Sequence, residues 1–162
     1  MMKISDVVYL TKKRLVELEN ELKDLKTSGR KQIAEKIAEA RAHGDLSENA
    51  EYDAAKEAQS HHEFKIGKLE IMLSKVKIIS PNDMPKDEVY ILSVVKVLDT
   101  KTKEEITFSL VSPEEADFER DKISVTSPIG NALLGKKKND VVEVTVPDGI
   151  IKYKVLQISK LN

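Results

Sequence analysis

The sequence contains no cysteine and no tryptophan, and its charges nearly cancel. Without cysteine, the chain can form neither a disulfide framework nor a thiolate metal site. The 27 Lys and Arg residues and 28 Asp and Glu residues leave a net charge of -1, so no global basic excess favours duplex DNA or an anionic membrane. The apolar run near the N-terminus is too short for a signal peptide or a membrane span. We therefore expect a cytoplasmic protein, without membrane association, that recognises charged partners locally.

Motifs of several enzyme classes are also missing. The sequence has no Gly-rich phosphate loop, no nucleophile elbow, and no His or carboxylate spacing that completes a zinc motif. His61 and His62 are adjacent and would point about 100° apart on a helix. The run Lys136–Lys138 could touch a phosphate or an acidic partner, but a charged loop on a small domain is usually just solvated.

The first part of the chain has a helical apolar pattern. Leu15, Leu18, Leu22 and Leu25 follow a 3,4,3 spacing between charged residues, which predicts an amphipathic helix with Thr11 as its N-cap. The stripe resumes at Ile33, eleven residues after Leu22. Since eleven is not a multiple of seven, we expect the helix to unwind locally around Ser28 and Gly29.

A second arm follows the stretch HGDLSENAEY, residues 43–52. Its seam steps by 3 and 4 without a break through eight positions: Tyr52, Ala55, Gln59, His62, Ile66, Leu69, Leu73 and Val76. Two arms of this length can pack only as an antiparallel coiled-coil hairpin about 45 Å long. Residues 43–52 then form its tip, and His62 has a structural place in the seam.

Alanine is frequent on both arms near this tip, at positions 34, 38, 40 and 42 and at positions 50, 54, 55 and 58. Small seam residues would let the two helices approach closely and make the distal end slender. The alternative is that alanine is simply the best helix former.

The periodicity changes near Ile79, where SPNDMP supplies turn residues, so we predict domains at 1–79 and 80–162. Beyond the boundary, runs at 89–98, 106–111, 123–126, 141–146 and 150–158 predict strands, the last two joined by a turn at Pro147-Asp148-Gly149. SPEEAD from Ser112 and SPIGNALLG from Ser127 both begin like helices. The predicted fold class is α+β, with an antiparallel sheet and a short helix in the second domain.

The predicted tip carries the acidic pair Asp45 and Glu48. One interpretation is a capping box, in which both carboxylates serve the N-terminal end of the second helix. The other is that a stalk ending in carboxylates carries oxygen ligands far from the body of the protein. Two carboxylates are too few to cage Mg²⁺, but they could complete a metal site that another macromolecule supplies.

Two stretches resemble a known family. Residues 40–52, ARAHGDLSENAEY, are similar to the tip signature of the bacterial transcript cleavage factors GreA and GreB, and residues 124–135, SVTSPIGNALLG, resemble their second signature. The resemblance covers nearly the whole chain, in order and with similar spacing. Within the family, the balanced charge of the stalk resembles the GreA branch more than the GreB branch.

The resemblance implies an accessory factor that is not an enzyme alone. Its hairpin would enter the secondary channel of bacterial RNA polymerase while an FKBP-like second domain holds the channel rim. The factor would stimulate cleavage of the 3′ end of backtracked nascent RNA. We expect a monomer, although heptads can pair within a chain or between chains.

The resemblance also implies roles for individual residues. Asp45 and Glu48 match the acidic pair that helps hold a second Mg²⁺ at the polymerase active site, and the isolated factor would bind no cofactor. Arg41 and Lys56 match positions of an RNA-contacting patch. Ser47 and Asn49 also match the motif, as polymerase-contacting or turn-shaping residues, and Tyr52 would anchor the seam.

Some positions depart from the family pattern. The first arm lacks the Glu-Gly that often follows Leu10-Thr11, and residues 136–140 lack a frequent glycine. Neither departure touches the tip. Inhibitory paralogues share the fold but alter the tip acids, so the presence of both acids favours cleavage activity. A stalked peptidyl-prolyl isomerase is a further alternative, but Tyr90, Phe108, Phe118 and Tyr153 are too few for its aromatic cage.

Overall fold

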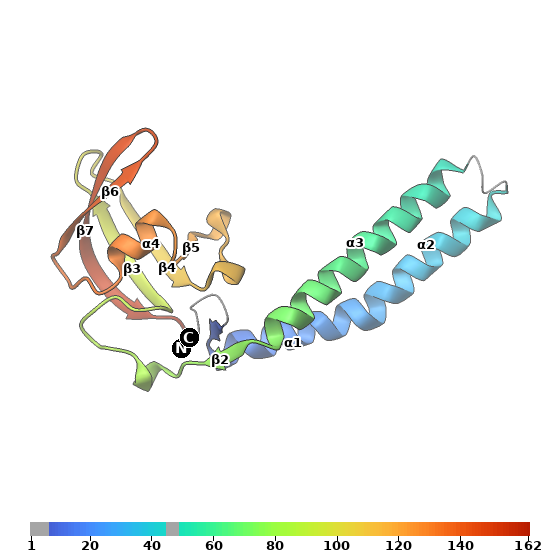
Figure 1. The fold of residues 1–162 in the computed structure, drawn as a ribbon, viewed down its shortest axis with the longest axis horizontal. Coiled ribbons are helices and arrows are strands. Elements are labelled where there is room, and N and C mark those ends of the chain that lie inside the picture. Colours follow the sequence, from blue (N-terminus) through green and yellow to red (C-terminus); the bar gives the residue numbers. More distant parts are fainter. Residues whose placement is uncertain (1–6, 45–48) are drawn as a thin grey trace. The chain divides into compact units, whose positions relative to one another are not determined.

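The computed structural model describes residues 7–44 and 49–162. The chain divides into two compact units (Figure 1): residues 14–75 form the helical one, and residues 7–13 join residues 76–162 in the other. We predicted the division between residues 79 and 80, with all of residues 1–79 in the hairpin. The difference arises because β1 (Val8–Leu10) pairs in parallel with β2 (Val76–Ile78), which brings both ends of the hairpin sequence into the second unit.

The first arm is helical from Lys12 to Ala42. It consists of α1 (Lys12–Asp24), a π-helical turn η2 (Leu25–Gly29) and α2 (Arg30–Ala42). Helix α1 starts directly after Thr11, as predicted. The backbone stays in the right-handed helical region at both ends of the π-turn, so the predicted unwinding is a widened turn and not a break.

The second arm is the single helix α3 (Ala50–Leu73), which lies beside the first arm (Figure 1). The predicted seam is confirmed, because every seam position of both arms that lies in these helices is buried or half-buried. Leu18 and Ile66 are 3% and 2% exposed. Val76, the last position of the predicted heptad, lies in strand β2, because α3 ends at Leu73.

We predicted that the alanines near the tip lie in the seam and make the tip slender, and most of them do not lie in the seam. Ala40 and Ala55 are buried beside Ile37, and Ala58 is half-buried. The other five alanines, at positions 34, 38, 42, 50 and 54, are exposed. Their abundance therefore fits helix propensity and not close packing.

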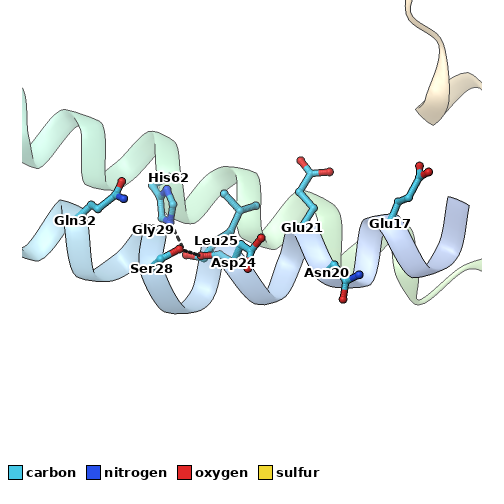
Figure 2. A pocket seen from close by; sticks show the side chains of 9 residues that line it. All are labelled: Glu17, Asn20, Glu21, Asp24, Leu25, Ser28, Gly29, Gln32 and His62. Atoms are coloured by element: carbon cyan, nitrogen blue, oxygen red, sulfur yellow. Dashed lines mark hydrogen bonds between the residues drawn. The ribbon is translucent and has the colours of Figure 1, made fainter.

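The π-turn is held by a side chain of the opposite arm (Figure 2). The imidazole Nε2 of His62 lies 2.7 Å from the carbonyl oxygen of Leu25, the first residue of the turn. Gly29 leaves room for this ring, because a Cβ at Gly29 would lie 2.5 Å from Cε1 of His62. The hydroxyl of Ser28 donates to the carbonyl oxygen of Asp24 at 3.1 Å. The turn thus exposes backbone acceptors that polar side chains satisfy.

The second unit contains a five-stranded sheet of order β5-β4-β3-β7-β6. The strands and the helix on the sheet are β3 (Ser93–Asp99), β4 (Glu105–Val111), β5 (Lys122–Ser124), α4 (Pro128–Leu133), β6 (Val141–Val146) and β7 (Gly149–Lys160). Its neighbours are antiparallel except β4 and β5, which are parallel. The sheet is therefore mixed, and the prediction of a purely antiparallel sheet was wrong at this edge.

Two local predictions in this unit need correction. The strand expected from Val89 begins only at Ser93, because Leu92 adopts a positive φ of 71° that interrupts an extended backbone. SPEEAD forms a short 3-10 turn (Pro113–Glu115) and no α-helix.

The second signature forms α4 and its cap. The hydroxyl of Ser127 accepts from the backbone N–H of Gly130 at 3.1 Å, and Pro128 opens the helix, as predicted. Leu133 is fully buried in the core of the unit together with Val95, Val97 and Val155. SPIGNALLG therefore has a clear part in the packing of this unit.

The contact of His62 with the π-turn predicts a coupling with Gly29. Gly29→Ala raises helix propensity by about 1 kcal/mol. In the wild-type chain it also forces the ring of His62 away from Leu25, which costs a hydrogen bond of about 1 kcal/mol. We expect Gly29→Ala to stabilise the protein in a His62→Ala background and to have little effect otherwise. Urea unfolding of the four chains measures this, and equal effects in both backgrounds would contradict it.

Candidate functional site

The first side of the tip is the C-terminal end of α2. The helix ends at Ala42 with His43 as its C-cap, and Gly44 follows with a φ of 111°, a conformation that favours glycine. The backbone N–H of His43 donates to the carbonyl oxygen of Ala40 at 3.3 Å. This end of the first arm agrees with a tip that begins at residue 43.

The second side of the tip is the N-terminal end of α3, which Asn49 caps. Its Oδ1 accepts from the backbone N–H of Tyr52 at 3.1 Å, and its own backbone is extended. We considered Asp45 as this cap, with Glu48 completing a capping box. That interpretation is wrong for α3, because the helix begins at Ala50 and its cap is Asn49.

Asn49 also contacts the opposite arm. Its side-chain Nδ2 donates to the carbonyl oxygen of Ala40 at 2.6 Å. The same carbonyl oxygen accepts the 3.3 Å bond from His43, so the amide of Asn49 adds a second, shorter bond that comes from the other helix. Sequence analysis placed Asn49 in the turn but missed this link. The asparagine directly before the alanine of α3 signals the cap, whereas nothing in the sequence signals the acceptor.

The other predicted tip residues, Asp45, Ser47 and Glu48, lie outside the described residues. The residues that flank them, Gly44 and Asn49, are described. The structure therefore shows the end of α2 and the start of α3, between which these three residues lie in the sequence. The assignment of the acidic pair stays a prediction.

Arg41 and Lys56 share one face next to the tip. The guanidinium of Arg41 lies over the ring of Tyr52, 5.8 Å from its centroid, and Tyr52 packs against Ile37, Ala40 and Ala55. The ammonium of Lys56 donates to Oε1 of Gln59 at 2.7 Å. Both cations line an open groove of ≈ 460 Å³ whose other walls are Ala34, Ile37, Ala38 and Gln59. The structure thus brings together the two basic residues singled out from the sequence.

A different face near the tip carries a polar contact between the arms. Nε2 of His43 lies 3.4 Å from Oε2 of Glu51, and both side chains are well exposed. Farther along the stalk, Arg30 makes two hydrogen bonds to Glu63, at 2.9 and 3.0 Å. These bonds lower the pKa of the Glu63 carboxyl and raise the pKa of Arg30. Because these side chains are exposed, their contacts add little to the stability of the hairpin. Their main effect is to fix which residues of the two arms face each other.

The described part of the chain contains neither a cluster of metal ligands nor a membrane-spanning helix. Across residues 7–44 and 49–162, no group of three or more His, Asp or Glu side chains is placed to hold a metal ion. No helix in those ranges is both long and apolar enough to cross a membrane.

The sequence matches two family models. Residues 8–78 match the model described as "Transcription elongation factor, N-terminal", and residues 84–160 match "Transcription elongation factor, GreA/GreB, C-term". Together the two matches cover most of the chain, including both signatures and every described residue of the tip.

The curated relatives of this chain agree with the two family matches. The chain is 53% identical over 155 residues to transcription elongation factor GreA of Chloroherpeton thalassium, covering 96% of this chain and 98% of the relative. It is 52% identical over 157 residues to the protein of that name from Thermoanaerobacter pseudethanolicus, covering 97% and 100%.

A solved structure, that of GreA factor homolog 1 from Thermus thermophilus, is 30% identical and covers 94% of this chain and 98% of its own, with a TM-score of 0.43. A superposition this loose adds nothing to the assignment, which rests on the sequence. With two matching domains and full-length relatives at about half identity, this chain belongs to the GreA/GreB family of transcription elongation factors.

Proposed function

We propose that this elongation factor binds bacterial RNA polymerase and lends Asp45 and Glu48 to the polymerase's own active site. There the two carboxylates help to hold a second Mg²⁺, and the polymerase cleaves the 3′ end of backtracked nascent RNA. The protein is then an activator of another enzyme's nuclease activity and has no such activity by itself. Arrested elongation complexes are released by the cleavage.

The observation that carries this proposal is the cap of α3. Since Asn49 supplies the N-cap, the helix does not need Asp45 or Glu48 for that purpose. The acidic pair stands between the ends of two helices, of which α3 alone has 24 residues and thus a length of about 36 Å. A helix hairpin of that length suits a narrow channel that a globular domain could not enter.

The two carboxylates of the tip are suitable ligands for a Mg²⁺ ion that the polymerase also coordinates. Carboxylate oxygens are the ligands that this ion prefers, but two of them leave most of its six positions to water and to other groups. When bound, a second Mg²⁺ polarises the phosphodiester and activates water. Asp45 and Glu48 would hold it, and the role of this chain is to bring their charges to a centre that already has its own ligands.

The remaining residues would bind and orient. Arg41 and Lys56 lie on one groove and present two cations within reach of a phosphate backbone beside the tip. Ser47 would shape or contact the surroundings of the acids. The second unit would provide most of the affinity for the polymerase at the rim of its secondary channel, through its fold or through the surface near SPIGNALLG.

Neutralising the two acids tests the central part of this proposal. We expect Asp45→Asn/Glu48→Gln to lower the stimulated cleavage of 3′-protruding RNA in backtracked complexes by about a hundredfold, while binding to the polymerase is retained. Glu35→Gln/Glu39→Gln is the matched control, because it removes equal charge from exposed acids of α2. Equal stimulation by wild type and the tip variant would refute the role of the acids.

The groove cations generate a second expectation. Lys56→Gln should lower stimulated cleavage several-fold and reduce the dependence of log activity on log salt by about one unit, because one phosphate contact is lost. Lys36→Gln serves as the control, since Lys36 is exposed and lines a different groove. An identical salt dependence for the Lys56 variant and wild type would show that Lys56 does not contact RNA.

A shared metal site requires weak binding by the factor alone. We expect isothermal titration of the isolated protein with Mg²⁺ to give a dissociation constant of about 1 mM or weaker, because two carboxylates complete only part of the coordination shell. Micromolar binding that Asp45→Asn abolishes would mean that the factor carries its own metal, in conflict with a site completed by the polymerase.

A further inference from the structure

The amide of Asn49 connects the ends of both helices at the tip. Its oxygen accepts from the backbone N–H of Tyr52 in the first turn of α3, and its nitrogen donates to the carbonyl oxygen of Ala40 in the last turn of α2. A carboxylate or a hydroxyl at this position could make the first bond, but a neutral amide is needed for both at this reach.

These two bonds reach backbone groups at the ends of the two helices. The N–H of Tyr52 lies in the first turn of α3, whose N–H groups have no carbonyl partner within that helix. The carbonyl oxygen of Ala40 accepts the amide of Asn49 at 2.6 Å in addition to a longer bond of 3.3 Å from the N–H of His43. One planar side chain serves both, so the last turn of one arm and the first turn of the other are fixed to each other through a single rigid group.

The acidic pair lies directly between these anchored ends. In the chain, Asp45 follows Gly44 and Glu48 precedes Asn49, so the acidic pair lies in sequence between the end of α2 and the start of α3, the two helix ends that the amide links. Groups that flank catalytic side chains and are themselves fixed can lower the entropy cost of bringing those side chains to a reaction.

We propose that Asn49 is a positioning residue for Asp45 and Glu48, acting through its bond to Ala40 and independently of its role as a helix cap. This inference rests on the proposed function of the acids and assigns Asn49 an internal role instead of contact with RNA or polymerase. Loss of the bond lowers the rate at which a bound factor stimulates cleavage and leaves the binding of the factor unchanged.

Two substitutions separate the bond to Ala40 from the cap. Asn49→Asp keeps the acceptor for Tyr52 but replaces the donor to Ala40 with an oxygen, and Asn49→Ser keeps a cap whose hydroxyl is too short to span both helices. Both residues are about as good as asparagine at a helix N-cap. Asn20→Asp, at an exposed position of α1, controls for the added charge.

The first readout is cleavage by backtracked polymerase over a range of factor and Mg²⁺ concentrations. We expect both Asn49 variants to stimulate cleavage about fivefold less at saturating factor, the effect of one net hydrogen bond, and to need more Mg²⁺ for their half-maximal rate. The factor concentration for half-maximal effect should not change. Wild-type rates in both variants would overturn the proposal, because they would leave Asn49 with only the cap.

The second readout does not depend on activity. Because the chain has no native cysteine, spin labels can be placed at Ala38→Cys and Ala54→Cys, two exposed positions on opposite arms. We expect the distribution of distances between them to broaden in both Asn49 variants. A lower cleavage rate with an unchanged distribution would overturn the positioning role in favour of direct contact, and a broader distribution with an unchanged rate would show that the bond does not serve the acids.

The Asp45→Asn/Glu48→Gln variant is assayed in parallel. If it cleaves like wild type, the proposed function of the acids fails, and the positioning role fails with it. If it is inactive while the Asn49 variants are normal in both readouts, only the role of Asn49 is refuted.

Discussion

The helical unit depends on the burial of one narrow apolar seam between two antiparallel arms. Leu18, Ile37, Ala40, Ala55 and Ile66 are its buried members, and the rest of both helices is largely exposed and charged. A hairpin of this kind has little core, since each helix buries a single stripe. Polar links between the arms, such as Arg30 with Glu63 and His62 with Leu25, therefore help to fix which residues face each other.

The seam could be predicted because helical periodicity is a local property of the sequence. The eleven-residue spacing from Leu22 to Ile33 likewise predicted the unwinding that appears as the π-turn. Its detailed form could not be predicted, because it depends on His62, thirty-seven residues away from the carbonyl that it contacts. The absence of a side chain at Gly29 is explained only by the position of that ring.

Contacts between distant segments also explain which predictions were wrong. A hairpin turn at Pro147 and Asp148 is encoded locally, and β6 and β7 pair around it as predicted. The parallel pairing of β4 with β5 is a choice between distant segments, and no short pattern specifies it. At the tip, Asp45 and Asn49 are both acceptable caps by residue type. The cap is Asn49 because α3 begins at Ala50, and Asn49 also bonds to Ala40, a contact that pattern alone does not reveal.

The chain belongs to a family of transcription elongation factors, and its two units differ in architecture. The second unit has a five-stranded sheet and a continuous hydrophobic core. The helical unit consists of two long arms, whose ends next to the tip are linked by the bond from Asn49 to Ala40. The proposed function requires the tip to reach the active site in the polymerase complex.

Photocrosslinking from the tip tests that location most directly. A single cysteine at Ala50, exposed and directly after Asn49, can carry a photoreactive probe in this cysteine-free chain. In a backtracked complex, the account predicts crosslinks to the 3′-terminal nucleotides of the RNA and to the polymerase segments around the catalytic Mg²⁺. Crosslinks confined to the outer surface of the polymerase, with the factor bound and cleavage stimulated, would contradict it.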